Sequence, residues 1–287
     1  MPKATVTFPI WAAKAIRVAK GAHMFIAFFI FGLGISVCVV LVLPFLFVLR
    51  RRGGHPAPVM QAITRHLFSR WLHFLKLGGL LDWQPPVGRA HPGPCVVVAN
   101  HPGLFDILFM VRDIESLSMM VKRSLARSVG LGLILNISGY VPTAVEGDVL
   151  SGIESVEQAV ARLRDGYRFA IFPEGTRSPK GGLHTFRAGA FKIAQWARVP
   201  IQPVLIFNDP PFLPHEDKWY YPPLETSHFR MTFLEPIVLS PDADVRVVAQ
   251  QLEELFARRL NIRTDRTTAE PDAHGVNRPG FVGGSIA

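Results

Sequence analysis

A long uncharged run near the start of the chain constrains its fold more than any other feature. Residues 21–49 contain no Asp, Glu, Lys or Arg, and they lie between Lys20 and the arginine triplet 50–52. The run is too long for the core of a signal peptide, and no small-residue cleavage site follows it. Core helices of soluble domains seldom continue this far without a charge. We therefore predict that residues 1–55 form a retained membrane anchor.

The geometry of this anchor stays open at the level of sequence. A helix over the run would be about 43 Å long, whereas the hydrocarbon core of a bilayer is about 30 Å thick. A tilted span and a re-entrant hairpin bent near Gly32 and Gly34 both fit that length. Basic residues flank the run on both sides, so the positive-inside rule does not choose an orientation cleanly. The arginine triplet directly adjoins the run, which favours a cytoplasmic location for the residues that follow. We predict attachment to the inner cell membrane from its cytoplasmic side.

The excess positive charge of the chain is concentrated around the same run. Ten of the 31 basic residues, and none of the 22 acidic ones, lie within residues 1–81. The remainder is therefore nearly neutral and lacks the basic surface of a nucleic-acid-binding protein. Basic side chains confined to the flanks of an apolar run suit the headgroups of anionic lipids. The two cysteines, Cys38 and Cys95, are consistent with a reducing compartment.

The periodicity changes after the anchor. In residues 56–82, apolar side chains recur at helical spacing with basic ones mainly between them. This predicts an amphipathic helix that lies at the bilayer surface or packs on a globular domain. From 83 to 263, short apolar runs alternate with helical stretches, which predicts an α/β domain with a mixed sheet sandwiched by helices. Residues 264–287 lack periodicity and are predicted to be a disordered tail.

Within the α/β domain, the individual elements can be placed by their patterns. Strands are expected at 95–99, 117–121, 168–172, 201–206 and 230–233. Helices are expected near 104–111, 151–164, 188–197 and 245–260. The proline-rich segment 208–228 is expected to be a long excursion.

Polar residues follow the first of these strands. The strand at 95–99 leads into Asn100 and His101 and, five residues after the histidine, Asp106. Side chains at the end of a strand lie where loops build sites. A carboxylate bonded to one ring nitrogen fixes the tautomer of a histidine, which makes His101 a candidate general base. The spacing alone is a weak signal, because ordinary surface polarity produces it by chance.

A second polar cluster follows the strand at 168–172. The sequence Phe-Pro-Glu-Gly-Thr-Arg-Ser occupies residues 172–178. Its carboxylate, flexible glycine, hydroxyl and guanidinium could together hold a phosphate or a glycerol headgroup. A turn with a surface ion pair explains the same residues equally well.

Together these motifs resemble those of the glycerophospholipid acyltransferase family, in particular the 1-acylglycerol-3-phosphate acyltransferases. The second cluster follows the His-Asp pair by about 70 residues, as in the family, and residues 186–192 and 199–204 resemble its further motifs. The resemblance extends over about residues 60–240. It implies that His101 and Asp106 are catalytic. It also implies direct transfer of a fatty acyl group from acyl carrier protein or coenzyme A to a lysophospholipid hydroxyl, without an acyl-enzyme.

The resemblance further implies how the substrates are bound, with 1-acylglycerol-3-phosphate as acceptor and phosphatidic acid as product. The family's second motif usually carries an arginine that is implicated in binding the acceptor phosphate, but this chain has Val145 there. Lys122 or Arg123 could supply the missing charge, or both could be surface cations. The departure leaves another lysolipid, an aminolipid or glycerol 3-phosphate open as acceptor. The expected substrate-binding residues are Asn100, Glu174, Gly175, Thr176, Arg177, Lys122 and Pro200.

No cofactor or metal is expected. The sequence has no H-E-x-x-H or comparable ligand set, no Walker A motif and no dinucleotide fingerprint. Backbone amides near Gly103 or Gly175 are candidates for stabilising an oxyanion. The expected partners are an acyl thioester donor, a lysophospholipid acceptor and membrane lipid, and not nucleic acid. A catalytically silent lipid-binding scaffold on the same fold is the alternative from another class.

Overall fold

A seven-stranded mixed sheet is the centre of the computed structural model, which describes residues 9–145, 147–212 and 222–264. In order across the sheet, the strands are β1 (Leu81–Trp83), β8 (Ser227–Phe233), β7 (Ile201–Asp209), β2 (Val96–Ala99), β5 (Arg168–Ile171), β3 (Leu117–Val121) and β4 (Val141–Pro142). Strands β7, β2, β5, β3 and β4 run in one direction, and β8 and β1 run against them. A separate pair joins β6 (Gly182–Leu183) to β9 (Arg263–Thr264).

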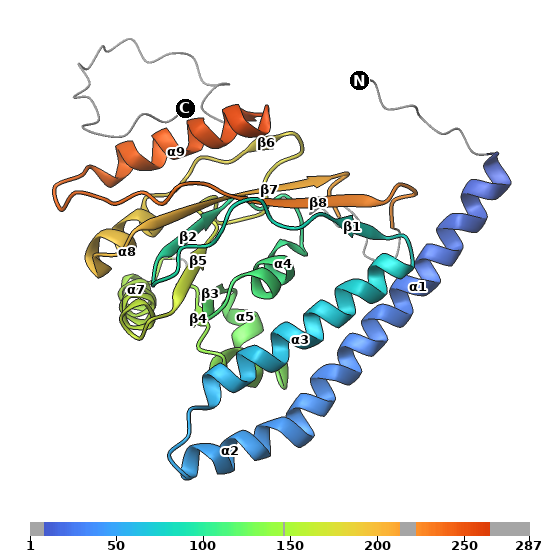
Figure 1. The fold of residues 1–287 in the computed structure, drawn as a ribbon, viewed down its shortest axis with the longest axis horizontal. Helices are drawn as coiled ribbons and strands as arrows, with labels where there is room; N and C mark the ends of the chain where they lie inside the picture. The colour runs from blue at the N-terminus through green and yellow to red at the C-terminus, as the bar shows by residue number, and fades with distance from the viewer. Residues whose placement is uncertain (1–8, 146, 213–221, 265–287) are drawn as a thin grey trace.

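Helices cover both faces of the sheet (Figure 1). On one side lie α3 (Pro56–Leu77) and α4 (Asp106–Asp113), and on the other lie α7 (Val149–Arg164), α8 (Gly189–Ala197) and α9 (Val245–Leu260). Two short helices, α5 (Arg123–Ala126) and α6 (Leu131–Ile137), follow β3. The predicted α/β fold, a mixed sheet between helical layers, is therefore confirmed.

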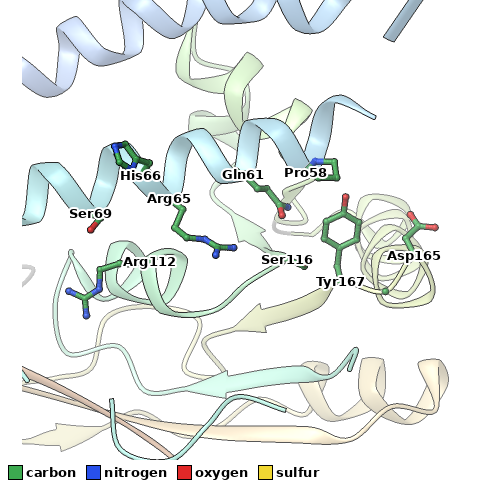
Figure 2. A pocket seen from close by; sticks show the side chains of 11 residues that line it. Pro58, Gln61, Arg65, His66, Ser69, Arg112, Ser116, Asp165 and Tyr167 are labelled. Carbon is green, nitrogen blue, oxygen red and sulfur yellow. The ribbon is translucent and has the colours of Figure 1, made fainter. Parts of the chain in front are cut away.

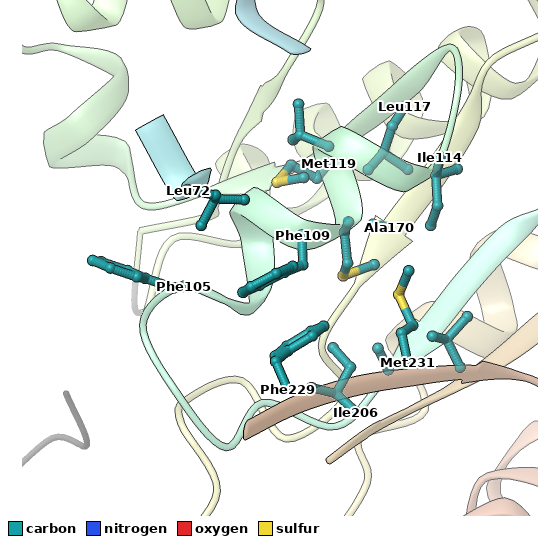
Figure 3. Packing of buried hydrophobic residues seen from close by; sticks show 14 of the residues in the cluster. Leu72, Phe105, Phe109, Ile114, Leu117, Met119, Ala170, Ile206, Phe229 and Met231 are labelled. Atoms are coloured by element: carbon teal, nitrogen blue, oxygen red, sulfur yellow. The ribbon is translucent and has the colours of Figure 1, made fainter. Parts of the chain in front are cut away.

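The alternation of side chains along the strands divides the apolar core into two layers. In β2, Val97 and Ala99 join the cluster under α3 and α4, whereas Val96 and Val98 join the cluster under α7, α8 and α9. Figure 3 shows the first cluster, in which the rings of Phe109 and Phe229 stack with centroids 3.7 Å apart. Because β2 is buried on both faces, its ends are held firmly in place.

The uncharged run forms one continuous helix. It begins as α1 (Ile10–Val37), passes through a π-helical turn, η1 (Cys38–Val42), and ends as α2 (Leu43–Arg51). The helix is unbroken at Gly32 and Gly34, so the hairpin that was one of two possibilities is not formed. Among the described residues, 10–51 make the one helix that is long and apolar enough to cross a membrane.

Helix α3 connects this long helix to the α/β domain, and it lies between the two in Figure 1. Trp71 Nε1 of α3 donates to the Ala27 carbonyl of α1 at 2.6 Å. His23 Nε2 donates to the Phe74 carbonyl at 2.8 Å, and Lys20 Nζ donates to the Leu224 carbonyl at 2.8 Å. The long helix is thus packed against the protein by polar as well as apolar contacts.

The expected elements can be compared with those observed. The strand at 117–121 and the helix at 245–260 have the predicted bounds, and the other expected elements differ by a few residues. The short elements β1, β4, α5 and α6 were not predicted, because each is too brief for a periodic pattern. The excursion at 208–228 is shorter than expected, since β7 continues to Asp209 and β8 begins at Ser227. Of the predicted tail, Thr264 belongs to β9, and residues 265–287 lie outside the described residues.

Candidate active site

The two polar clusters meet because β2 and β5 are neighbouring parallel strands. Val98 of β2 is in register with Ile171 of β5, so the residues that follow both strands emerge at the same edge of the sheet. We call this the catalytic edge, defined by the loops after β2 (100–105) and β5 (172–178). Loops at the carboxyl ends of parallel strands are where α/β proteins usually place their sites.

The predicted pair is in direct contact. His101 Nδ1 lies 2.9 Å from Asp106 Oδ2, and the carboxylate is fully buried at the first turn of α4. The same Oδ2 accepts a hydrogen bond from the Gly103 N–H at 2.7 Å. The imidazole also stacks on the ring of Phe172, with centroids 4.0 Å apart. These contacts fix the ring so that Nε2 is the nitrogen left for a reactant.

Burial and hydrogen bonding act in opposite directions on the Asp106 carboxyl. Burial raises its pKa, because the charged form is removed from water, and the hydrogen bond from His101 opposes that effect. The N-terminus of α4 adds a favourable field for a negative charge. An ionised Asp106 beside His101 would hold the imidazole in the tautomer that leaves Nε2 free to accept a proton.

Glu174 supports this pair from the neighbouring loop. Its buried carboxylate accepts from the His101 N–H at 3.1 Å and from Ser178 Oγ at 2.6 Å through Oε1. Through Oε2 it accepts from the His184 N–H at 2.9 Å. Burial raises the pKa of this carboxyl, whereas the bond from Ser178 acts the other way. The structure thus directs the Glu174 carboxylate to two backbone N–H groups and the Ser178 hydroxyl, directly behind His101.

Ser178 ends the motif at 172–178 but is not among the predicted site residues. Its Oγ accepts from the His101 N–H at 3.2 Å, and its own N–H donates to the His101 carbonyl at 2.8 Å. The backbone of His101 is therefore bonded on both sides by the loop after β5. The only sequence signal for this role was the position of Ser178 at the end of the motif.

Asn100 occupies the last position before the histidine and is also turned inward. Its Nδ2 donates to the Ile206 carbonyl, and its Oδ1 accepts from the Ile206 N–H, both at 2.8 Å. This pair of bonds ties the end of β2 to β7. The polar atoms of Asn100 therefore hold the loop in position and do not face the open side of the site.

Gly175, Thr176 and Arg177 are the more accessible part of the second cluster. Gly175 has φ +73°, and a Cβ there would lie 3.0 Å from the Arg187 guanidinium, so the position favours glycine. Thr176 is exposed and Arg177 is half-buried, both on the loop that carries Glu174. Thr176 and Arg177 are therefore polar side chains of this loop that reach solvent.

The remaining predicted residues lie farther from His101. Lys122 directly follows β3, which neighbours β5, so it is exposed on the same edge of the sheet. Arg123 Nε donates to the Thr143 carbonyl, in the loop that leads to Val145. Pro200 precedes β7, and its carbonyl accepts from Val96 at the start of β2. It therefore lies at the opposite edge of the sheet, five residues along β2 or roughly 16 Å from the histidine, so it is not part of this site.

The two glycine amides considered for an oxyanion hole are already used. The Gly103 N–H donates to Asp106, and the Gly175 N–H donates to the Phe172 carbonyl at 3.1 Å. Neither is free to stabilise an oxyanion in this geometry. Gly103 is needed for a different reason, because a Cβ would lie 2.6 Å from Asn208 Nδ2 and 2.9 Å from the Phe212 carbonyl.

Neither cysteine has the setting of a nucleophile. Both are buried and unpaired, and burial raises the pKa of Cys95 to about 12. Among the described residues, no group of three or more His, Cys, Asp or Glu side chains is arranged to hold a metal ion. The chemistry that the site offers is that of a histidine and a carboxylate.

Two cavities lie away from the catalytic pair. One, of about 550 Å³, opens between α3 and the residues before β3 and β5, so it is at the opposite edge of the sheet (Figure 2). Its charged side chains have partners, since Arg65 pairs with Glu115 and Arg112 with Asp113. The other, of about 230 Å³, is apolar and lies between α1, α3 and α6. Among the described residues that line the first cavity, no histidine contacts a carboxylate as His101 contacts Asp106. The apolar lining of the second cavity suits a hydrocarbon chain.

Comparison with known proteins relates this chain to acyltransferases. A model of the acyltransferase family matches residues 87–207. The 1-acyl-sn-glycerol-3-phosphate acyltransferase alpha of Mus musculus is 30% identical over 165 residues, which cover 55% of this chain and 56% of that protein. The alpha enzyme of Homo sapiens is 34% identical over 116 residues, covering 39% and 40%. The chain thus spans about half the length of the curated relatives it matches.

A solved structure extends the comparison to nearly the whole chain. The crystal structure of the 1-acyl-sn-glycerophosphate (LPA) acyltransferase PlsC from Thermotoga maritima superposes with a TM-score of 0.64. It covers 91% of this chain and 99% of the other, at 18% sequence identity. At this sequence identity, the likeness concerns the fold.

Proposed function

We propose that this chain, whose residues 87–207 match the model of the acyltransferase family, transfers a fatty acyl group from a thioester to the hydroxyl of a lysophospholipid. The observation that carries the proposal is the 2.9 Å contact between His101 Nδ1 and the buried Asp106 carboxylate. A histidine held in this way can act as a general base, and the hydroxyl of the acceptor is the group from which it would take a proton. We take 1-acylglycerol-3-phosphate as the acceptor, because the curated relatives are named for it.

The proposed reaction has two stages on one histidine. Nε2 of His101 removes the proton of the acceptor hydroxyl, and the hydroxyl oxygen attacks the carbonyl carbon of the thioester. The tetrahedral intermediate then collapses, the carbon–sulfur bond breaks, and the protonated histidine returns the proton to the departing thiolate. Asp106 stabilises the imidazolium between the two transfers. The product is the ester together with the free thiol of the donor, and no covalent enzyme intermediate is formed.

Arg177 and Thr176 are proposed to bind the acceptor headgroup. They are the accessible polar side chains on the loop after β5, and a guanidinium can bind two phosphate oxygens at once. Lys122 is exposed at the end of β3, on the same edge, and adds a second cation. Asn100 and Glu174 contribute indirectly, because their hydrogen bonds hold the loops that carry these residues.

The donor thioester and the acceptor can be tested together. Purified full-length protein is supplied with radiolabelled acyl-CoA or acyl carrier protein and with a panel of lysophospholipids, an aminolipid and glycerol 3-phosphate. We expect the highest kcat/KM with 1-acylglycerol-3-phosphate. Preference for another acceptor would retain the chemistry and correct the substrate, in keeping with Val145 at the position of the family arginine. No transfer to any acceptor, with either donor, would favour the scaffold alternative.

We further propose that the long helix lies in one leaflet of the membrane, the cytoplasmic one, and attaches the protein there. A stripe of buried residues on its inner side runs from Lys20 to Leu46, a length of about 39 Å, and packs on α3 and the domain. Helix α3 lies alongside with exposed Arg70 and Lys76. Passage through the bilayer would carry these charges into hydrocarbon, which is costly.

This attachment predicts the sidedness of both chain ends. Tags placed at the N-terminus and C-terminus of the full-length protein should be cleaved by protease from the same side of sealed membrane vesicles. The protein should also remain with the membranes in high salt, because apolar burial does not weaken with ionic strength. Cleavage of the two tags from opposite sides would establish a transmembrane span.

A further inference from the structure

The segment from α5 to α6 exposes three large apolar side chains, one in each helix and one in the turn between them. Leu125 is 46% exposed, Val129 is 98% exposed and Leu133 is 50% exposed. We call these three residues the α5–α6 patch. An isolated exposed apolar residue is ordinary, but three within nine residues of the chain are a candidate surface for a partner or a lipid.

The charge around this patch is of a single sign. Residues 116–145 contain three basic residues, Lys122, Arg123 and Arg127, and no acidic one. Arg127 and Lys122 are exposed on either side of Leu125. Apolar side chains with cations beside them match the interface of a bilayer, where the apolar groups enter the acyl region and the cations meet anionic headgroups.

The patch adjoins the outward apolar surface of the long helix. A Cβ at Gly130 would lie 3.3 Å from Val39 and 3.4 Å from Ile35, so the turn packs directly on that helix. Ile134 of α6 is buried in a cluster with Cys38 of η1. Close by on the helix, Val40 and Leu41 are 67% and 65% exposed. The patch therefore continues a surface that is already apolar and proposed to contact lipid.

The position of the patch connects it to catalysis. Helix α5 begins immediately after β3, at the edge of the sheet where β2 and β5 deliver His101 and Glu174. We propose that the α5–α6 patch is a second membrane-contact surface, which inserts into the same leaflet as the long helix and holds the catalytic edge at the level of the lipid headgroups. Two separated contacts fix the orientation of the domain, whereas one helix would allow it to rotate about the helix axis.

This orientation gives the acceptor a short path. A lysophospholipid keeps its acyl chain in the bilayer while its headgroup reaches the loops that carry His101 and Arg177. The inference rests on the proposed membrane attachment but not on the reaction. Its test can therefore fail or succeed independently of any acyl transfer.

The experiment compares two exposed valines on opposite edges of the sheet. Val129→Cys places a thiol on the patch, and Val238→Cys places one at an 82% exposed position beside Ile237, which bridges to Ile201 at the start of β7. Each variant is labelled with the environment-sensitive fluorophore NBD in full-length protein. The unsubstituted chain, whose two cysteines are buried, gives the labelling background. The proteins are reconstituted in vesicles of phosphatidylcholine and phosphatidylglycerol, with or without lipids that carry a doxyl quencher near the top of the acyl chain.

Insertion of the patch predicts a difference between the two labels. The label at 129 should emit at shorter wavelength and lose intensity with doxyl lipid, because interfacial side chains enter about 5–10 Å into the bilayer. The label at 238 should do neither and should remain open to aqueous iodide. Equal behaviour of the two labels would overturn the proposal. So would a label at 129 that is shielded from both iodide and doxyl lipid, because a protein would then cover the patch.

Discussion

The catalytic edge and the long-helix side of the molecule are stabilised in different ways. At the catalytic edge, buried Asp106, Glu174 and Asn100 each make two or more hydrogen bonds to a neighbouring loop or strand. On the long-helix side, side chains such as Phe25 and Phe29 are more than 60% exposed and rely on apolar surroundings. A site built from a few directional bonds should be sensitive to single substitutions, whereas a broad apolar face should tolerate them.

The largest expected effect is at His101, the proposed general base. His101→Ala should lower kcat by about 10²-fold to 10⁴-fold, the usual contribution of a general base. The matched control is His73→Ala, on α3, where the exposed imidazole bonds to the Ser69 carbonyl of its own helix and contacts the edge of the Trp83 ring, outside the loops that define the catalytic edge. In steady-state kinetics, kcat of His101→Ala should be lower than kcat of His73→Ala by at least about two orders of magnitude. An active His101→Ala protein would remove the proposed mechanism.

A second test asks whether His101 and Asp106 act as one unit. Asp106→Asn should cost an amount comparable to His101→Ala, and the double variant should be little worse than the more damaged single one. This non-additivity follows because the carboxylate acts through the imidazole. Independent, multiplying losses would show that the two residues do not act as a unit.

A smaller effect is expected at Arg177, which is proposed to bind the acceptor and not to take part in bond making. Hydrogen bonds to charged groups contribute about 1.5–3 kcal/mol, so Arg177→Ala should raise the acceptor KM by roughly 10-fold to 100-fold. The donor KM and kcat should change little. Lys180→Ala is the control, since Lys180 is an exposed cation two residues beyond the motif. Equal increases in both KM values would argue against a headgroup role for Arg177.

Glu174 should matter for stability as well as for activity. Glu174→Ala leaves the His184 N–H and the Ser178 hydroxyl without this acceptor, and the His101 N–H keeps only its bond to Ser178 Oγ. Each unsatisfied buried group costs about 1–3 kcal/mol, so the midpoint of thermal unfolding should fall clearly. The control, Glu154→Ala, removes an exposed carboxylate that pairs only with Gln158 one helical turn away. A Glu174→Ala protein as stable as this control would mean that water replaces the carboxylate.

The same contrast explains what could be predicted from the sequence. The long helix and the strands of the sheet follow from periodicity, and His101, Asp106 and Glu174 follow from motifs at strand ends. The inward direction of Asn100 and Glu174 could not be predicted, because a motif gives residue types and not which loop their oxygens face. Pro200 was assigned to the site through its motif, yet the parallel register puts it at the other edge of the sheet. The α5–α6 turn carried no periodic signal at all.

The pH dependence offers the most detailed test of the catalytic edge. Burial raises the pKa of Asp106 in the folded protein, whereas the unfolded chain releases that proton near the ordinary value of about 4. Between the two values the folded state therefore binds more protons than the unfolded state. By linkage, the contribution of this group to the free energy of unfolding falls as the pH rises through the interval, and stays constant above it. Residues 56–81, which include α3, contain no acidic side chain. Helix α3 therefore has no carboxyl group that could change the free energy of unfolding in the same way.

Asp106→Asn removes this titration and keeps the shape of the side chain. The stability of the variant relative to the unsubstituted protein should therefore increase as the pH is raised from about 4, measured by denaturant unfolding followed through tryptophan fluorescence. Activity should respond in the opposite direction, since a protonated Asp106 no longer stabilises the imidazolium that forms on His101. The unsubstituted enzyme should lose activity on acidification while its Asp106 stability term improves. A relative stability that is flat or falling with pH would mean that the hydrogen bonds from His101 and Gly103 outweigh burial, and that Asp106 ionises at no cost to the fold.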